Sequence, residues 1–115
     1  MSAAGAASGN LLADLPQRPA SPDAERLDVL LATPCLRIER IVSMGQASPS
    51  GFWYDQDRAE WVLVVSGSAG LLFEDETEPH ALGPGDWVHI AAHRRHRVLW
   101  TDAKNPTVWL AVHHD

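Results

Sequence analysis

The chain has little cysteine, no long apolar run and no excess of positive charge, and each absence excludes a class of protein. Cys35 is the only cysteine among 115 residues, so no disulfide can form within the chain and a reducing, cytoplasmic location is indicated. No apolar run approaches the roughly 18 residues that a membrane-spanning helix needs. The first residues lack the positive start and apolar stretch of a secretion signal, so we do not expect one.

Charge narrows the range of partners. Nine basic residues stand against fifteen acidic ones, which gives a net charge of −6. Nucleic acids and anionic membranes bind through clustered Lys and Arg, so the balance disfavours both as partners. With 45% apolar residues, the chain is long enough for one globular domain with a core of its own.

The first third of the chain predicts an arm and a short helix. Residues 1–20 begin with Ala, Gly and Ser and continue through two prolines, a composition that indicates a flexible N-terminal arm. Residues 21–33 carry the signals of a helix start, with Ser21 as the N-cap, Pro22 at the first helical position and acidic residues behind it. Pro34 would end this helix.

From residue 35 onward the hydrophobic period changes to two, which is typical of strands. Residues 61–65 are continuously apolar, and we expect that strand to be buried on both faces. Short strands separated by Gly-, Pro- and Ser-rich turns indicate an all-β sandwich or barrel. The expected strands are residues 36–42, 52–54, 61–65, 69–74, 80–82, 87–90, 96–101 and 107–113.

Two spacings link this pattern to a known family. Gly85 stands eleven residues before His96, and Glu60 stands seven before Gly67. Both intervals resemble the two sequence motifs of the cupin superfamily, and the likeness extends over roughly residues 36–113. It implies a double-stranded β-helix, also called a jelly-roll or cupin barrel, over residues 35–115, of the small single-domain bacterial type.

The chain also departs from the family motifs. In the second motif Ala91, His93 and Trp100 replace the Pro, Gly and Asn of the pattern. In the first motif the two histidines are absent, and depending on the gap their places are taken by Tyr54 and Gln56 or by Trp53 and Asp55. The resemblance therefore supports the fold more strongly than it supports a metal site.

The resemblance places His96 at the position of a metal-binding histidine and Glu60 at that of a metal-binding carboxylate. Asp55 or Gln56 would be a third ligand, since strand alternation allows only one of these neighbours to point inward, and His113 a fourth. Mixed nitrogen and oxygen ligands suit a divalent Zn, Fe, Mn or Ni ion. Such an ion acidifies bound water or polarises a carbonyl group.

The remaining polar residues near this position predict a pocket. Tyr54 could position a substrate or act as an acid. His93, Arg94 and Arg95 would lie at the pocket rim, where they could attract an anionic ligand or remain solvated. The five tryptophans either line a pocket for a small molecule or pack the core and an interface.

Two functions of different class follow. The first is a metal-dependent enzyme acting on a small molecule, and the second is a binding or sensing module that holds a small ligand without metal or chemistry. The sequence does not decide whether the protein is an enzyme. Apolar strands and many tryptophans also predict a homodimer in which the outer sheet packs on a second copy, with the N-terminal arm crossing to it.

Overall fold

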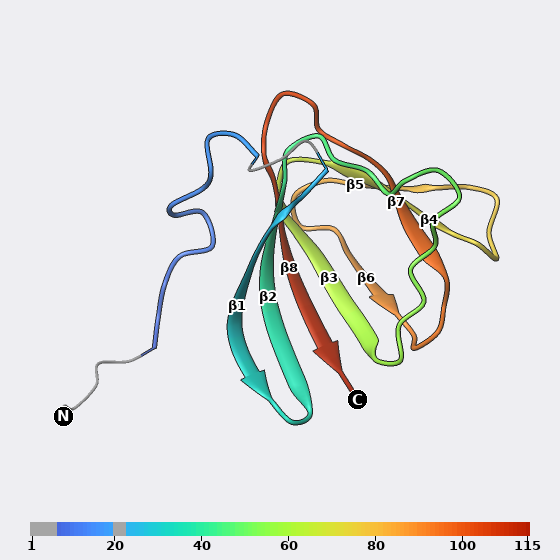
Figure 1. Ribbon diagram of the computed structural model, residues 1–115, viewed down its shortest axis with the longest axis horizontal. Coiled ribbons are helices and arrows are strands. Elements are labelled where there is room, and N and C mark those ends of the chain that lie inside the picture. Colours follow the sequence, from blue (N-terminus) through green and yellow to red (C-terminus); the bar gives the residue numbers. More distant parts are fainter. Residues whose placement is uncertain (1–6, 20–22) are drawn as a thin grey trace.

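A computed structural model describes residues 7–19 and 23–115 of the chain. The described residues form an all-β domain of eight antiparallel strands and contain no helix (Figure 1). This confirms the predicted double-stranded β-helix. The strands are β1 (Arg26–Thr33), β2 (Leu36–Ser43), β3 (Ala59–Ser66), β4 (Ala69–Phe73), β5 (His80–Leu82), β6 (Trp87–Ile90), β7 (His96–Thr101) and β8 (Thr107–His114).

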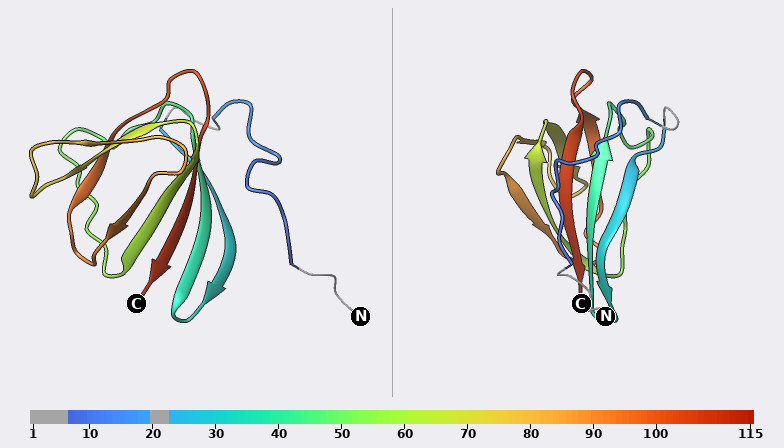
Figure 2. Two further views of the ribbon diagram at one scale, coloured as in Figure 1. Left: turned by 180° about the vertical axis from the view of Figure 1, so that it is seen from behind. Right: turned by 90° about the vertical axis from the view of Figure 1, so that its left-hand side faces the viewer.

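The strands are arranged in two sheets that face each other (Figures 1 and 2). The larger sheet has the order β1-β2-β8-β3-β6 and the smaller one the order β5-β4-β7. Sequence neighbours such as β3 and β4 lie in different sheets, so the chain crosses between the two layers at its turns. The residues on the inner face of each sheet therefore point into a shared interior.

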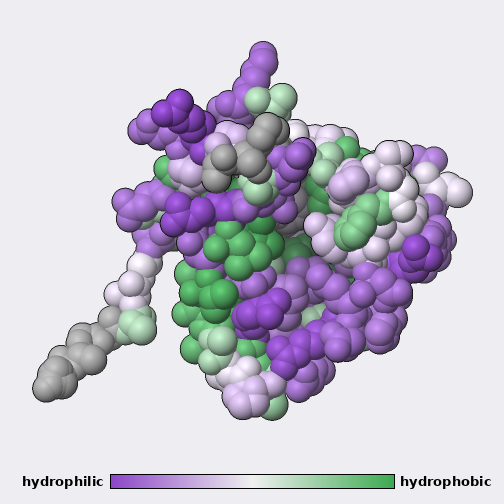
Figure 3. All heavy atoms as spheres, in the orientation of Figure 1, coloured by the Kyte–Doolittle hydropathy of each residue, from purple (hydrophilic) through white to green (hydrophobic). Residues whose placement is uncertain are grey.

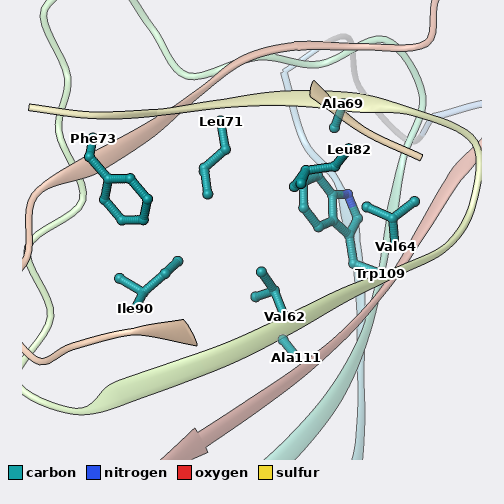
Figure 4. Packing of buried hydrophobic residues seen from close by; sticks show 9 residues of the cluster. All are labelled: Val62, Val64, Ala69, Leu71, Phe73, Leu82, Ile90, Trp109 and Ala111. Carbon is teal, nitrogen blue, oxygen red and sulfur yellow. The ribbon is translucent and has the colours of Figure 1, made fainter. Parts of the chain in front are cut away.

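That interior is filled from both sheets. Phe73, Leu71 and Ala69 extend from β4 toward Ile90 and Val62, which extend from the opposite sheet (Figure 4). Burying each of the larger side chains contributes about 1.5–3 kcal/mol relative to leaving it exposed. The buried cluster consists of Val62, Val64, Ala69, Leu71, Phe73, Leu82, Ile90, Trp109 and Ala111.

The helix expected over residues 21–33 is wrong, because residues 26–33 form strand β1. The two residues expected to start the helix, Ser21 and Pro22, lie outside the described residues. Strand β1 pairs along its length with β2, for example Leu27 with Ile41, with a β-bulge between Val29 and Leu31. A helix cap contributes only about 1 kcal/mol, whereas the ladder with β2 satisfies the backbone groups that face β2 along most of the segment.

Two further strand predictions need correction. Residues 52–54 do not form a strand, and only Tyr54 joins the ladder, through an isolated bridge to His96. Strand β3 is not buried on both faces: Glu60, Val62 and Val64 are buried while their neighbours are half-buried. The alternation shows that one face of β3 belongs to the core and the other to the outer surface of the sheet.

The N-terminal arm is attached to the outer surface of the larger sheet through Arg40. The Arg40 guanidinium donates from Nη1 to the carbonyl oxygens of Leu11 (3.3 Å) and Ala13 (2.6 Å), and it pairs with Asp28 at 2.8 Å. The predicted flexibility of residues 1–20 stays a prediction, and residues 1–6 and 20 lie outside the described residues. No helix in the described chain is long and apolar enough to cross a membrane.

Gly67 lies where the chain crosses from β3 to β4, at a φ of +86° that favours glycine. A Cβ atom here would lie 2.6 Å from the Thr107 Cα. This close approach allows the Thr107 hydroxyl to donate to the Ser68 carbonyl and to accept from the Ser68 amide, at 3.0 and 3.2 Å. The tight turn therefore fixes the start of β8 against the crossover between the sheets.

Candidate functional site

A cavity of about 320 Å³ lies between the two sheets. Its volume is at the lower end of the range for small-molecule sites. Side chains from every strand except β5 line it, together with Glu25, Tyr54 and Gln56 from the segments before β1 and β3. The lining residues are Glu25, Leu27, Arg37, Glu39, Ile41, Tyr54, Gln56, Glu60, Val62, Leu71, Ile90, His96, Val98, Trp109 and His113.

Strand β2 presents charged residues to this cavity. Arg37, Glu39 and Ile41 alternate along the strand and all line the cavity, while Leu36 and Ile38 lie in the opposite phase. Glu39 is only 3% exposed. A carboxylate buried to this extent needs partners, since an unpaired buried charge is strongly destabilising.

His113 and Arg37 provide those partners. The His113 Nε2–H donates to Glu39 Oε1 at 2.9 Å, and Arg37 Nε lies 2.8 Å from Glu39 Oε2. Both oxygens of the carboxylate are thus engaged. Because Nε2 of His113 donates to Glu39, its hydrogen and ring orientation are fixed by this contact.

Glu60 lies between the two buried imidazoles. Its Oε2 is 3.6 Å from His113 Nε2 and its Oε1 is 3.8 Å from His96 Nε2, both beyond hydrogen-bond length. Burial raises the pKa of Glu60 above its ordinary value, and the nearby His113 and His96 imidazoles oppose this change. A carboxyl group whose pKa is raised in a cavity is typical of groups that exchange protons.

His96 enters the cavity from β7 and is 5% exposed. Its Nδ1 lies 2.9 Å from the Arg94 carbonyl oxygen, so Nδ1–H donates and Nε2 of the neutral ring keeps a lone pair. That lone pair is on the nitrogen nearest to Glu60. The Phe73 ring, 6.2 Å away between centroids, shields the imidazole on the side of the smaller sheet.

The segment before β3 holds Tyr54 and Gln56 against the cavity. The backbone of Tyr54 exchanges two hydrogen bonds with His96, at 2.7 and 3.2 Å, and the two rings stack with centroids 5.3 Å apart. Burial raises the pKa of Tyr54, and the charges of Glu25 and Glu60 raise it further. Its phenol therefore stays protonated near neutral pH.

The structure brings Tyr54, Gln56, Glu60, His96 and His113 of the predicted site together, and places Asp55 elsewhere. Asp55 is exposed and its Oδ1 lies 2.8 Å from Nδ1 of His93, another exposed side chain. Of the two neighbours, Gln56 is the one that points inward. This follows from alternation along an extended segment, in which adjacent side chains point to opposite sides.

The three residues predicted at the rim do not line the cavity. Arg94 lies over the Phe73 ring, 3.7 Å from its centroid, and pairs with Asp75 and Glu76. Arg95 pairs with Glu74 at 3.1 Å. These ion pairs hold the loop before β7 to the end of β4 and leave neither guanidinium directed at the cavity.

A metal site is not formed by the side chains as they lie. Among residues 7–19 and 23–115, no three His, Cys, Asp or Glu side chains are grouped in a way that could hold a metal ion. The donor set gives a reason: Nε2 of His113 carries the hydrogen that it donates to Glu39, whereas a metal ligand must present a lone pair. As the side chains lie, Nε2 of His113 is therefore engaged with Glu39 and does not present a lone pair to a metal ion.

Sequence reasoning missed Arg37 and Glu39. Their strand alternates apolar and charged residues, a pattern that normally has its apolar side in the core. The one available signal was their phase with Ile41 and Ser43, which places all four on one face. The inward position of charged residues became clear only when β2 was paired with β8, which carries His113.

Comparisons with known proteins agree with this architecture. A protein-family profile described as "Cupin domain" matches residues 41–113. The chain is similar to a protein of solved structure from Ralstonia eutropha JMP134 that bears the provisional name mannose-6-phosphate isomerase. The two share 58% sequence identity over 94% of this chain and 97% of that one, with a TM-score of 0.88.

More distant similarities show the fold alone. A cupin superfamily protein from Desulfitobacterium hafniense DCB-2 is 15% identical over 84% of this chain and 83% of its own, with a TM-score of 0.67. An RmlC-like cupin with a double-stranded β-helix fold from Methanocaldococcus jannaschii is 17% identical over 91% and 93%, with a TM-score of 0.63. The curated proteins contain no match to this chain.

Proposed function

The chain belongs to the cupin domain family, and from that premise we propose that its cavity binds a small organic molecule and moves a proton on it. The observation that carries the proposal is the set of buried, titratable side chains lining one cavity: Glu39, Glu60, His96 and His113. Burying four such groups is unfavourable for stability alone. Groups of this kind cluster where proton transfer is performed.

The reaction class that suits these groups is isomerisation by proton transfer. Glu60 accepts a proton from a carbon next to a carbonyl group, and the C–H electrons form a double bond as the carbonyl oxygen takes a proton. Glu60 then returns its proton to the former carbonyl carbon. The hydroxyl group on the carbon that first lost its proton becomes the new carbonyl and gives its hydrogen back to the group that protonated the first oxygen, so no added reactant is needed. The provisional name of the Ralstonia protein, which also ends in isomerase, supports the same class.

Each polar side chain has a role in this scheme. Glu60, with its raised pKa, is the general base, because bases are most effective when their pKa approaches the working pH. The phenol of Tyr54, which stays protonated near neutral pH, supplies the proton at the carbonyl oxygen, and the lone pair on Nε2 of His96 accepts a hydrogen bond from a substrate hydroxyl group. Tyr54 positions the substrate through its phenol, and Glu39 is a positioning residue that acts through His113.

The test is deuterium exchange into small aldoses and ketoses, followed by NMR in heavy water. The wild-type protein should introduce deuterium next to the carbonyl, and Glu60→Gln should reduce the rate at least about 100-fold, as removal of a general base does. Glu74→Gln removes the same charge at an exposed position and serves as the matched control. Equal rates in wild type and Glu60→Gln would contradict the proposal.

A binding or sensing module without chemistry is the alternative. It is favoured by the gaps of 3.6 and 3.8 Å around Glu60, which leave this carboxyl group unconnected to either imidazole. In that case ligands would raise the unfolding temperature, while no deuterium would enter any of them. Thermal shift and exchange measured on the same compounds separate the two functions.

A divalent metal held by His96, Glu60 and His113 is a separate proposal. Since His113 would first have to release Glu39, metal binding should liberate a proton and weaken this contact. Elemental analysis of protein purified without chelator, with His96→Ala for comparison, measures this directly. Near-stoichiometric Zn, Fe, Mn or Ni in wild type and its loss in the variant would support the proposal.

We further propose a homodimer that involves β1. Within residues 7–19 and 23–115, this strand is at the edge of its sheet and has a pairing partner on one side only. Its exposed apolar side chains form a hydrophobic area over β1 (Figure 3); they are Leu27, Val29, Leu30 and Leu31. Antiparallel pairing with β1 of a second copy would satisfy the free edge and cover this area.

Light scattering tests the dimer. Wild type should have about twice the mass of the chain, and Leu30→Glu should shift it to the monomer, because a charge would then face its own copy across the interface. Asp57→Lys, at an exposed position away from β1, is the control. A mass of 12.6 kDa for wild type at micromolar concentration would contradict this proposal.

We also propose a cytoplasmic location for the protein. Cys35 is exposed and unpaired among the described residues, and an exposed thiol persists best in a reducing compartment. Cell fractionation followed by detection of the protein would test it.

A further inference from the structure

We infer that the cavity takes an uncharged or cationic small molecule rich in hydrogen-bond donors, and that it disfavours phosphorylated and other anionic ligands. This inference concerns the same cavity and rests on the proposed function, since it needs the cavity to be a ligand site. It adds the chemical class of the ligand.

The first argument is the charge of the cavity wall. Three carboxyl groups line the cavity, those of Glu25, Glu39 and Glu60, against one guanidinium, that of Arg37. Arg37 is already engaged, because its Nε lies 2.8 Å from Glu39 Oε2. An anionic ligand would therefore meet like charges in a partly desolvated space, with no uncommitted guanidinium or ammonium group to offset them.

The second argument is the engagement of the arginines nearest the cavity. Arg94 and Arg95 pair with acidic side chains of the β4–β5 region. Arg97 donates from Nη2 to the Ser48 carbonyl oxygen at 3.2 Å and lies 5.7 Å from the Trp53 ring centroid, while its Nε is buried without a hydrogen-bond partner among the described residues. Phosphate recognition normally uses a bidentate arginine or a clustered basic group, and none of these three side chains lines the cavity.

The third argument is an excess of acceptors. Oε1 of Gln56 is buried and has no hydrogen-bond partner in the described chain. Nε2 of neutral His96 presents a lone pair, since its Nδ1–H is donated to the Arg94 carbonyl oxygen. Glu60 accepts no hydrogen bond within hydrogen-bond length from either imidazole. Hydroxyl or ammonium groups of a ligand would supply the donors that these atoms lack.

The test compares ligands that differ in charge but share one framework. D-Mannose, D-mannosamine and D-mannose 6-phosphate are titrated into the full chain, and the imidazole resonances of His96 and His113 report entry into the cavity. We expect the neutral sugar and the amine to bind at least about tenfold more tightly than the phosphate, a difference well within the interaction of neighbouring like charges. Equal or tighter binding of the phosphate would overturn the inference.

Charge variants sharpen the comparison. Glu60→Gln and Glu39→Gln each remove a carboxyl group from the cavity wall and should raise the affinity for the phosphate relative to mannose. Asp75→Asn makes a matched change at an exposed position outside the cavity, and should leave that ratio unchanged. An unchanged ratio in both cavity variants would overturn the inference.

The experiment also separates this inference from the proposed function. If polyols, amines and phosphates all leave both imidazole resonances unshifted, the cavity is not a ligand site and both proposals fail. If the phosphate is preferred, the ligand site stands and only the charge preference fails.

Discussion

The two walls of the cavity differ in charge. The larger sheet contributes the charged side chains Arg37, Glu39 and Glu60 together with His113, whereas the smaller sheet contributes Leu71, Val98 and, among titratable side chains, His96 alone. Burial is the leading cause of the raised Glu60 pKa, and both sheets supply apolar residues to the core. The charged side chains and the apolar core can therefore be altered separately.

The largest effect should come from the apolar core. Phe73→Ala removes a ring that is 1% exposed and should lower the free energy of unfolding by about 3–5 kcal/mol, through lost burial and the cavity left behind. Chemical denaturation with two probes measures it. A loss under about 1 kcal/mol would show that the Phe73 ring contributes little to the stability of the core.

A smaller loss is expected on the charged wall at Glu39. Glu39→Ala leaves the buried Nε2–H of His113 without its acceptor and should cost about 2 kcal/mol. Glu39→Gln keeps an acceptor oxygen and should cost less, which makes it the matched control. If the two variants are equally unstable, the hydrogen bond to His113 is not what the carboxylate provides.

Glu60 should affect the pH dependence of the free energy of unfolding more than its magnitude at any one pH. Its folded-state pKa is raised, so the folded protein binds more protons than the unfolded chain between the ordinary value of 4.5 and the folded pKa. Its contribution to stability is therefore greatest at low pH and decreases as pH rises through that window. Glu60→Gln should flatten this part of the stability profile, and an identical profile in the variant would contradict it.

The smallest effect is expected outside the cavity. Asp55→Ala breaks the exposed contact to His93 and should change stability by at most about 0.5 kcal/mol, as surface ion pairs usually do. Ligand affinity should also stay the same, measured against Gln56→Ala in the neighbouring position. Lost affinity in Asp55→Ala would place this carboxylate in the site after all.

The fold could be predicted because its signals are local and repeated. The turn at residues 83–86 has the Gly85 φ of +91°, and the Asp86 side chain accepts from the Gly83 amide at 2.8 Å. Such turns, spaced along a chain of period-two strands, specify a β-barrel. The interval from Glu60 to Gly67 spans strand β3 and the turn that follows it, so a local pattern is enough to relate these two positions.

The site was only partly predictable because it depends on pairing between distant strands. Glu39 meets His113 across 74 residues of sequence, and no local pattern marks either one as buried. The same limit explains why residues 26–33 form a strand and not the expected helix. The local sequence carries helix-capping signals, but pairing with β2 determines the structure of this segment. The sequence does not decide between Asp55 and Gln56 for the same reason. Alternation shows that only one of the two side chains points inward, but not which one.

The contact between Arg40 and the arm has a consequence for how freely this segment can change. Arg40 donates hydrogen bonds to the backbone carbonyl oxygens of Leu11 and Ala13, and every amino acid has such an oxygen. Replacing the side chains of Leu11 and Ala13 should thus leave these two contacts intact, whereas replacing Arg40 would remove both. These contacts depend on the side chain of a barrel residue and only on the backbone of the arm. The amino-acid sequence of the arm at these positions can therefore change without loss of the contacts.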